Sequence, residues 1–181
     1  VKLADENNHP GKFTAFCSYE WTSMPDNRNL HRNVFFRDCA KVPDYPFSSL
    51  DSTRPTELWN WMDAQRKAGN ELLAISHNAN VSDGWMYPVD VDQTTGRPIH
   101  AAWAAARDRS ERLVEIKQCT GQSETHPLLS PNDEFADYEL WDKGNLDTSA
   151  AKTKEILEFE DTRSALKNVL MLEAKLGVNV Y

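Results

Sequence analysis

A short apolar run that directly follows a helix-like segment places the strongest constraint on the fold. Residues 72–75 read Leu-Leu-Ala-Ile, and an apolar run that contains a β-branched residue is typical of a buried strand. The preceding residues 55–68 predict a helix, because Pro55 suits its first turn and Gly69 its end. A helix followed at once by a strand is typical of a parallel sheet. The sequence therefore predicts an α/β fold of mostly parallel strands that alternate with helices.

The rest of the chain also predicts strands and helices, which are joined by long irregular connections. Further strands are expected at residues 13–21, 31–37 and 113–116, and further helices at 99–110 and 161–176. The connections at 40–54, 78–97 and 118–148 are rich in Pro, Gly, Asn and Ser, which favour loops. A length of 181 residues suits one domain with a real core. We therefore expect a single domain over residues 1–181.

Composition excludes some classes of function. The net charge of −8 argues against nucleic acid as a partner, because nucleic-acid surfaces normally carry a basic stripe. No apolar run approaches the length of a membrane span. The three cysteines, Cys17, Cys39 and Cys119, are far apart and odd in number, so we expect reduced or buried thiols. The sequence assigns no compartment, and a periplasmic or secreted parent protein stays open.

Three ligand-type side chains fall at or near the ends of predicted strands. They are Glu20, His31 and His77, and a carboxylate with imidazoles suits divalent ions such as Zn, Mn or Fe. In α/β folds, ligands bind at the carboxyl ends of parallel strands. The spacings of 11 and 46 residues are not diagnostic by themselves. The alternative is that each residue is an ordinary structural or surface residue.

Polar residues beside these three could bind a substrate. Arg32 and Arg37 could hold an anionic group, because a guanidinium fork suits phosphate. Asn78, next to His77, is the third candidate for substrate binding. Ion pairing of the two arginines within the fold is the alternative.

A second rank of candidates lies further along the chain. Glu115 follows Val114 in an apolar strand, where a carboxylate lies at the strand mouth or pairs with a cation. Glu124 and His126 are two residues apart, so in an extended segment both side chains would face the same way. The alternative for this pair is a polar surface loop.

Several strings of the sequence resemble the DUF3604 family. They lie at residues 13–22, 31–37, 75–78, 115–127 and 129–135, in the order that the family shows. DUF3604 proteins in turn resemble the PHP (polymerase and histidinol phosphatase) superfamily of metal-dependent phosphoesterases. This resemblance implies a PHP-like distorted (β/α)7 barrel, with divalent metal ions at its carboxyl end and Glu20, His31 and His77 among the ligands. It further implies a hydrolase that acts on a phosphoester in a small-molecule substrate.

The sequence also departs from the PHP pattern. It contains neither the His-x-His motif that follows the first strand nor the closing Asp-x-His motif. We therefore expect an internal fragment of a larger DUF3604 protein that binds metal weakly or not at all and has little activity. Open sheet edges would favour self-association of such a piece.

Two alternatives to a phosphoesterase stay open. The chain could be a non-catalytic binding or structural domain in which the His and Glu side chains only satisfy polar groups. It could also be a metal-dependent hydrolase of an amide, a sulfate ester or a sugar ester. Only the metalloenzyme hypotheses predict that metal affinity depends on Glu20, His31 and His77 together.

Overall fold

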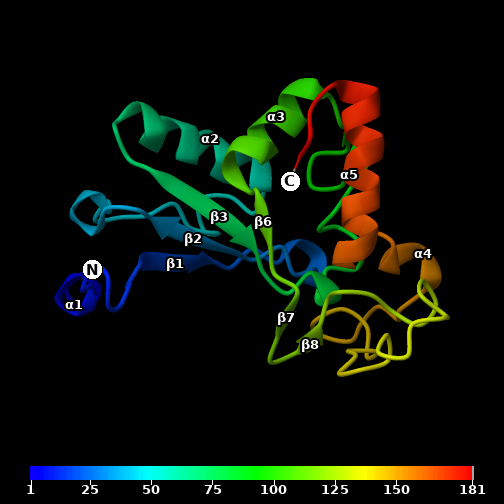
Figure 1. Ribbon diagram of the computed structural model, residues 1–181. Helices are drawn as coiled ribbons and strands as arrows, with labels where there is room; N and C mark the ends of the chain where they lie inside the picture. Colours follow the sequence, from blue (N-terminus) through cyan, green and yellow to red (C-terminus); the bar gives the residue numbers. More distant parts are fainter. Residues whose placement is uncertain (181) are drawn as a thin grey trace.

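The computed structural model describes residues 1–180 and contains a four-stranded sheet with helices packed on one face (Figure 1). The sheet order is β1 (Cys17–Trp21), β2 (Arg32–Phe36), β3 (Leu72–Ser76) and β6 (Leu113–Val114). The longer helices are α2 (Pro55–Lys67), α3 (Ala101–Ser110) and α5 (Thr162–Leu176). Each of these elements lies within a segment that the sequence predicts to be a strand or a helix, except for small shifts at the ends.

Short elements lie between and before the main strands and helices. Two helices are short, α1 (Lys2–Asn7) and α4 (Lys154–Leu157). Two small hairpins are formed by β4 (Val91–Asp92) with β5 (Arg97–Pro98) and by β7 (Lys117–Gln118) with β8 (Gly121–Gln122). Three 3-10 turns are η1 (Pro25–Asn27), η2 (Cys39–Lys41) and η3 (Ala79–Val81). No helix of residues 1–180 combines the length and the apolar character needed to cross a membrane.

The α/β class is confirmed, but the strand directions need a correction. Strands β1 and β2 and strands β2 and β3 pair antiparallel, and only β3 and β6 pair parallel. The prediction of mostly parallel strands was wrong because the chain between β2 and β3, although it contains α2, returns beside β2 in the opposite direction. The part of the chain that the structure describes forms no closed barrel, so a PHP-like (β/α)7 barrel stays a prediction.

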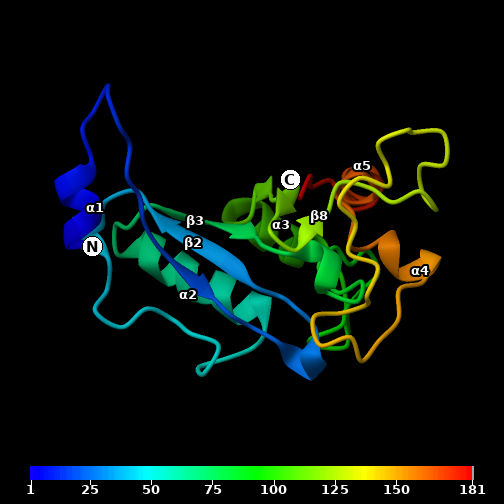
Figure 2. The same ribbon diagram turned by 90° about the horizontal axis from the view of Figure 1, so that it is seen from below.

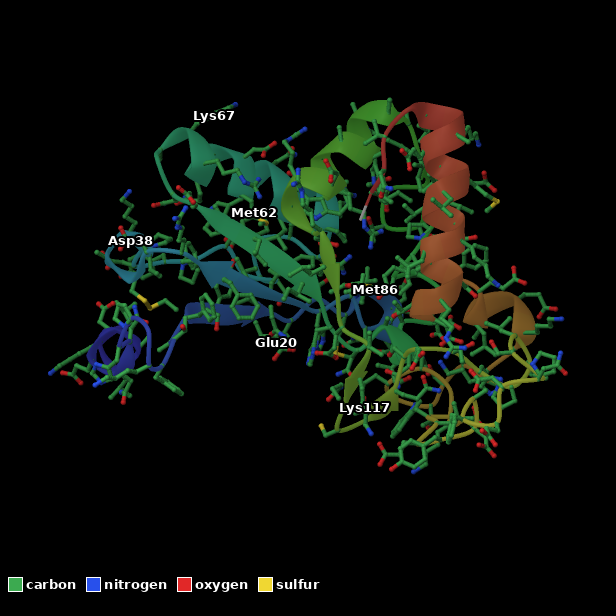
Figure 3. All side chains as sticks on the ribbon, in the orientation of Figure 1. Glu20, Asp38, Met62, Lys67, Met86 and Lys117 are labelled. Atoms are coloured by element: carbon green, nitrogen blue, oxygen red, sulfur yellow. A yellow bond between two sulfur atoms is a disulfide. The ribbon has the colours of Figure 1, made fainter. Side chains whose placement is uncertain are left out.

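The core lies between the sheet and the helices. Alternate residues of the strands point to opposite faces of the sheet, and the inward set includes Trp21, Val34 and Ala74, which are fully buried. They pack in one apolar cluster with Leu58 and Met62 of α2. Figure 3 shows Met62 between α2 and the strands. Burial of this face fixes which side of each strand is covered.

A disulfide joins the start of β1 to the turn after β2. Cys17 and Cys39 are bonded, with their Cα atoms 5.4 Å apart. The expectation of reduced or buried thiols was therefore wrong for these two residues, which form a disulfide, whereas Cys119 is free and exposed. The antiparallel register explains the pairing: Cys17 lies opposite Phe36, which is three residues before Cys39. That proximity depends on strand pairing, and the spacing of 22 residues does not reveal it.

The face of the sheet away from the helices, here called the outer face, is largely open. Its residues Leu73 and Leu113 are 40% and 52% exposed. Figure 2 shows α1 near one end of the strands and the yellow to orange segment at the other. The outer face is therefore a surface that a ligand can reach.

Candidate functional site

Four ligand-type side chains meet at one end of the outer face, and we call them the His–Glu cluster: Glu20, His31, His77 and Glu115. Antiparallel pairing puts the end of β1, the start of β2 and the end of β3 at the same edge of the sheet, and parallel pairing adds the end of β6. Figure 3 shows Glu20 on the side of the sheet away from Met62. The sheet thus gathers residues that are up to 95 positions apart in the sequence.

Each imidazole of the cluster has a carboxylate at its Nδ1 atom. His31 Nδ1 lies 2.8 Å from Glu20 Oε1, and His77 Nδ1 lies 2.7 Å from Glu115 Oε2. The two rings are nearly parallel, with an interplanar angle of 25° and centroids 6.4 Å apart. Because a carboxylate can only accept, Nδ1 is the donating nitrogen of each neutral ring. The lone pair of each neutral ring is therefore on Nε2.

Neither Nε2 atom is satisfied by a hydrogen bond. His31 Nε2 is buried and without a hydrogen-bond partner. His77 Nε2 lies 3.8 Å from Glu20 Oε1, beyond hydrogen-bond range. Buried polar atoms are nearly always paired, so an imidazole nitrogen with no partner from the chain is suited to bind a ligand or an ion.

The two histidines differ in their affinity for a proton. Burial lowers the pKa of His31, and the carboxylate of Glu20 opposes this shift only in part. The hydrogen bond to Glu115 raises the pKa of His77, against the effect of its burial. His31 therefore favours the neutral form, whose Nε2 is a metal donor, whereas a ligand at His77 Nε2 must displace a more tightly held proton.

Asn78 is close to the cluster but does not offer its side chain to it. Its backbone N–H donates to Glu115 Oε1 at 3.2 Å. Its side-chain Oδ1 accepts a hydrogen bond from Thr120 Oγ1 at 2.5 Å, and the residue is 8% exposed. As the side chains lie, Asn78 supports Glu115 through its backbone and its Oδ1 is bound to Thr120. A role for Asn78 in substrate binding stays a prediction.

The two arginines that the sequence offers for substrate binding lie elsewhere. Arg32 is on the covered face, where its Nε donates to Glu111 Oε1 at 2.8 Å and the residue is 1% exposed. Arg37 is exposed at the opposite end of β2 and pairs with Glu71 at 2.5 Å. His31 and Arg32 are consecutive residues, so their side chains point to opposite faces of the sheet. The structure therefore does not bring either arginine to the His–Glu cluster.

An apolar pocket lies beside Arg37 and not beside the cluster. Its volume is about 290 Å³, and Phe16, Phe35 and Leu73 contribute to its lining. It occupies the outer face at the end of β2 that is opposite to His31.

Glu124 and His126 are engaged with other partners. Glu124 accepts from Arg163 at 2.6 Å, and His126 Nε2 lies 2.9 Å from Asp142 Oδ1. The expectation that both face one ligand stays a prediction. Their side chains are held by these pairs within the irregular segment after β8.

The imidazole and carboxylate groups of the cluster are suitable ligands for a divalent ion. As the side chains lie, however, their donor atoms do not surround one common position. Two ligands on one tetrahedral zinc ion, each about 2.1 Å from the metal, lie about 3.4 Å apart. Glu20 Oε1 and His77 Nε2 are 3.8 Å apart, close to that separation. Among residues 1–180 no three His, Cys, Asp or Glu side chains are arranged to hold a metal ion as they lie. Side chains of the cluster would have to move before three of them could hold one ion.

Sequence reasoning ranked Glu115 second, whereas the structure makes it a full member of the cluster. The available signal was its place after an apolar pair, Leu113 and Val114, at a strand end like that of His77. Pairing of Ser76 with Val114 then brings His77 beside Glu115. That pairing is a tertiary property of the sheet.

Comparison with known proteins gives a family but no function. A family model described as "Protein of unknown function (DUF3604)" matches residues 1–181. No curated protein matches the chain. No solved structure matches it either.

Proposed function

We propose, from the premise that this chain belongs to the DUF3604 family, that its His–Glu cluster binds a divalent metal ion and that the natural protein is a metal-dependent hydrolase. The proposed substrate class is a phosphoester in a small molecule. The class of reaction follows from the resemblance of the family to PHP phosphoesterases. The metal proposal rests on the cluster itself.

One observation carries the metal proposal: both imidazoles place Nδ1 on a carboxylate and leave Nε2 free of hydrogen bonds. Metal-binding histidines almost always donate their other ring N–H to a carboxylate, a carbonyl or water, which fixes the tautomer and the ring orientation. The same pattern occurs twice here, on adjacent strands. A pair of purely structural histidines, with ring centroids 6.4 Å apart, has no need for two Nε2 atoms without hydrogen bonds.

This proposal assigns two roles, metal binding and orientation of an imidazole, and Glu20, which lies at His31 Nδ1, would have both. His77, His31 and Glu20 would hold the metal, which would be Zn, Mn or Fe. Glu115 would orient His77 through Nδ1, with little direct contact to the ion. A bound divalent ion supplies an activated water and neutralises charge on the phosphoryl group. The exposed side of Glu20, 41% accessible, leaves room for a substrate on the outer face.

Metal content tests the proposal directly. The chain, and any longer natural protein that contains it, would be loaded with Mn, Zn or Fe, desalted and analysed by mass spectrometry. We expect His77→Ala, which removes a ligand, to lose more bound metal than Glu115→Ala, which removes an orienting carboxylate and should lower the affinity about 10- to 100-fold. His9→Ala is the matched control, because His9 is an exposed histidine outside the cluster.

Two outcomes would contradict the proposal. If the chain, and any longer protein that contains it, stays free of metal after loading, the metalloenzyme hypothesis fails, and the non-catalytic binding domain replaces it. If metal binds but phosphoesters are not cleaved while sulfate esters, sugar esters or amides are, the substrate class is wrong. Substrate profiling of the metal-loaded longer protein separates these cases.

A further inference from the structure

We infer that Asn29, Asn78 and Thr120 form a positioning device, here called the Asn–Thr clamp, that fixes His77 in the tautomer with a bare Nε2. This inference rests on the proposed function for its purpose, since a bare Nε2 is what a metal ion needs. The geometry of the clamp stands by itself. It begins at a backbone conformation that most residues avoid.

Asn78 occupies the left-handed region of backbone space, with φ 59° and ψ 48°. Residues other than glycine rarely adopt this conformation, and Asn tolerates it better than most. Here it turns the chain sharply after β3, so that the N–H of Asn78 donates to Glu115 Oε1 at 3.2 Å. The ring of the preceding residue, His77, donates from Nδ1 to the other oxygen, Glu115 Oε2, at 2.7 Å. Two consecutive residues thus hold both oxygens of one carboxylate.

The side chain of Asn29 binds the carbonyl groups of this turn. Asn29 is 0% exposed, and its Nδ2 donates to the carbonyl oxygens of His77 at 2.7 Å and of Asn78 at 3.1 Å. Its own N–H donates to the carbonyl of Val81 at 3.3 Å. These bonds connect the loop before β2 to the turn after β3. Asn29 therefore fixes the two peptide units that carry the imidazole and the N–H at Glu115.

Thr120 binds the side chain of Asn78 in the same turn. Its Oγ1 donates to Asn78 Oδ1 at 2.5 Å, and Gln118 Nε2 donates to the same Oγ1 at 2.7 Å. The hairpin of β7 and β8 is thereby attached to Asn78. With Asn29 and Thr120 both in place, the left-handed turn has partners for its side chain and for its carbonyl groups. Backbone strain of this kind persists only where the surroundings determine it, and it is concentrated at functional sites.

The chemical consequence concerns one proton. With Glu115 held by two donors, its Oε2 faces His77 Nδ1, which must carry the hydrogen. The neutral ring then keeps its lone pair on Nε2, which points to the side of Glu20. Asn29, Asn78 and Thr120 act through Glu115 and touch no reacting atom, so they are positioning residues.

The tautomer of His77 can be measured without metal and without substrate, by 15N NMR of the ring nitrogens at a pH above the pKa of His77. In the natural sequence we expect Nδ1–H and a bare Nε2. We expect Asn29→Ala and Thr120→Val to give a mixture of tautomers, because Glu115 loses its fixed orientation. In the same variants, affinity for Co²⁺ should fall by about 10- to 100-fold.

Two matched controls separate positioning from general destabilisation. Asn145→Ala removes another buried Asn whose Nδ2 donates to a backbone carbonyl, that of Asn27. Thr94→Val removes another half-buried Thr hydroxyl, which donates to Asp92 Oδ1 at 2.6 Å. Neither contact reaches the cluster, so both variants should keep the tautomer of His77.

The inference is overturned if folded Asn29→Ala and Thr120→Val keep the natural tautomer, or if the controls shift it as much. Should Asn29→Ala fail to fold, Thr120→Val alone decides, because it removes a single hydroxyl from a partly exposed turn. If the natural chain and the longer protein bind no Co²⁺ but the tautomer responds as expected, the proposed metal function fails and the clamp stands. If Co²⁺ binds but the tautomer does not respond, the clamp fails and the metal function stands.

Discussion

Loss of the disulfide between Cys17 and Cys39 should lower the free energy of unfolding by about 3 kcal/mol. The bond closes a loop with a sequence separation of 22 residues. For such a loop, the chain-entropy relation gives about 3.4 kcal/mol at 25 °C from the restricted unfolded state. In a chain of 181 residues this corresponds to a fall in Tm of about 6–12 °C.

Urea unfolding of oxidised and reduced protein measures this effect most cleanly, because the two samples share every atom except the bond and two hydrogens. Unfolding would be followed by tryptophan fluorescence and by far-UV circular dichroism. Cys119→Ser serves as the control, since Cys119 is free and exposed and its change should leave the midpoint unmoved. Equal midpoints for the oxidised and reduced protein would refute the pairing or the stabilisation argued from it.

Two further predictions concern buried charge. Burial raises the pKa of Glu160 and of Asp161 to about 7. The folded state therefore binds their protons more tightly than the unfolded chain does. The stability from these groups is complete below their ordinary pKa values, 4.5 for Glu160 and 3.8 for Asp161, and is lost as the pH rises through about 7. Over this range the free energy of unfolding should fall, because of Glu160, by at most on the order of 3 kcal/mol. Glu160→Gln should make the dependence of stability on pH flatter. If chemical denaturation gives the same dependence for the variant, the raised pKa of Glu160 is contradicted. In the second prediction, Arg32→Ala should cost about 3–5 kcal/mol, because it leaves the carboxylate of Glu111 buried without this partner. Its control, Arg37→Ala, removes an exposed ion pair and should cost much less. Equal costs in thermal unfolding would show that the burial argument is mistaken.

Local patterns were enough to find the main elements. The helix over 55–68 became α2 at Pro55–Lys67, and the apolar run at 72–75 became β3 at Leu72–Ser76. The helix over 161–176 became α5 at Thr162–Leu176, and it ends at Gly177 with φ 72°. The predictions for these segments were correct because hydrophobic periodicity and the residues at helix ends are local signals, which depend on neighbours within a few positions.

The candidate site was found only in part. Glu20, His31 and His77 come together as the sequence suggested, although their role as metal ligands stays a prediction. Arg32 was grouped with them by sequence proximity, yet it lies on the covered face with Glu111. A strand residue and its neighbour face opposite ways, and the sequence of β2 alone does not say which face is covered.

The sequence by itself determined which segments become helices and strands, and it supplied the imidazoles and carboxylates at the strand ends. The tertiary structure decided how these ends meet. Antiparallel pairing of β1, β2 and β3 brings Glu20, His31 and His77 to one edge, and parallel pairing of β6 adds Glu115. Helix and strand patterns arise from neighbours in the chain, whereas strand direction, register and the covered face arise from contacts between residues far apart in sequence. The site is a product of those distant contacts.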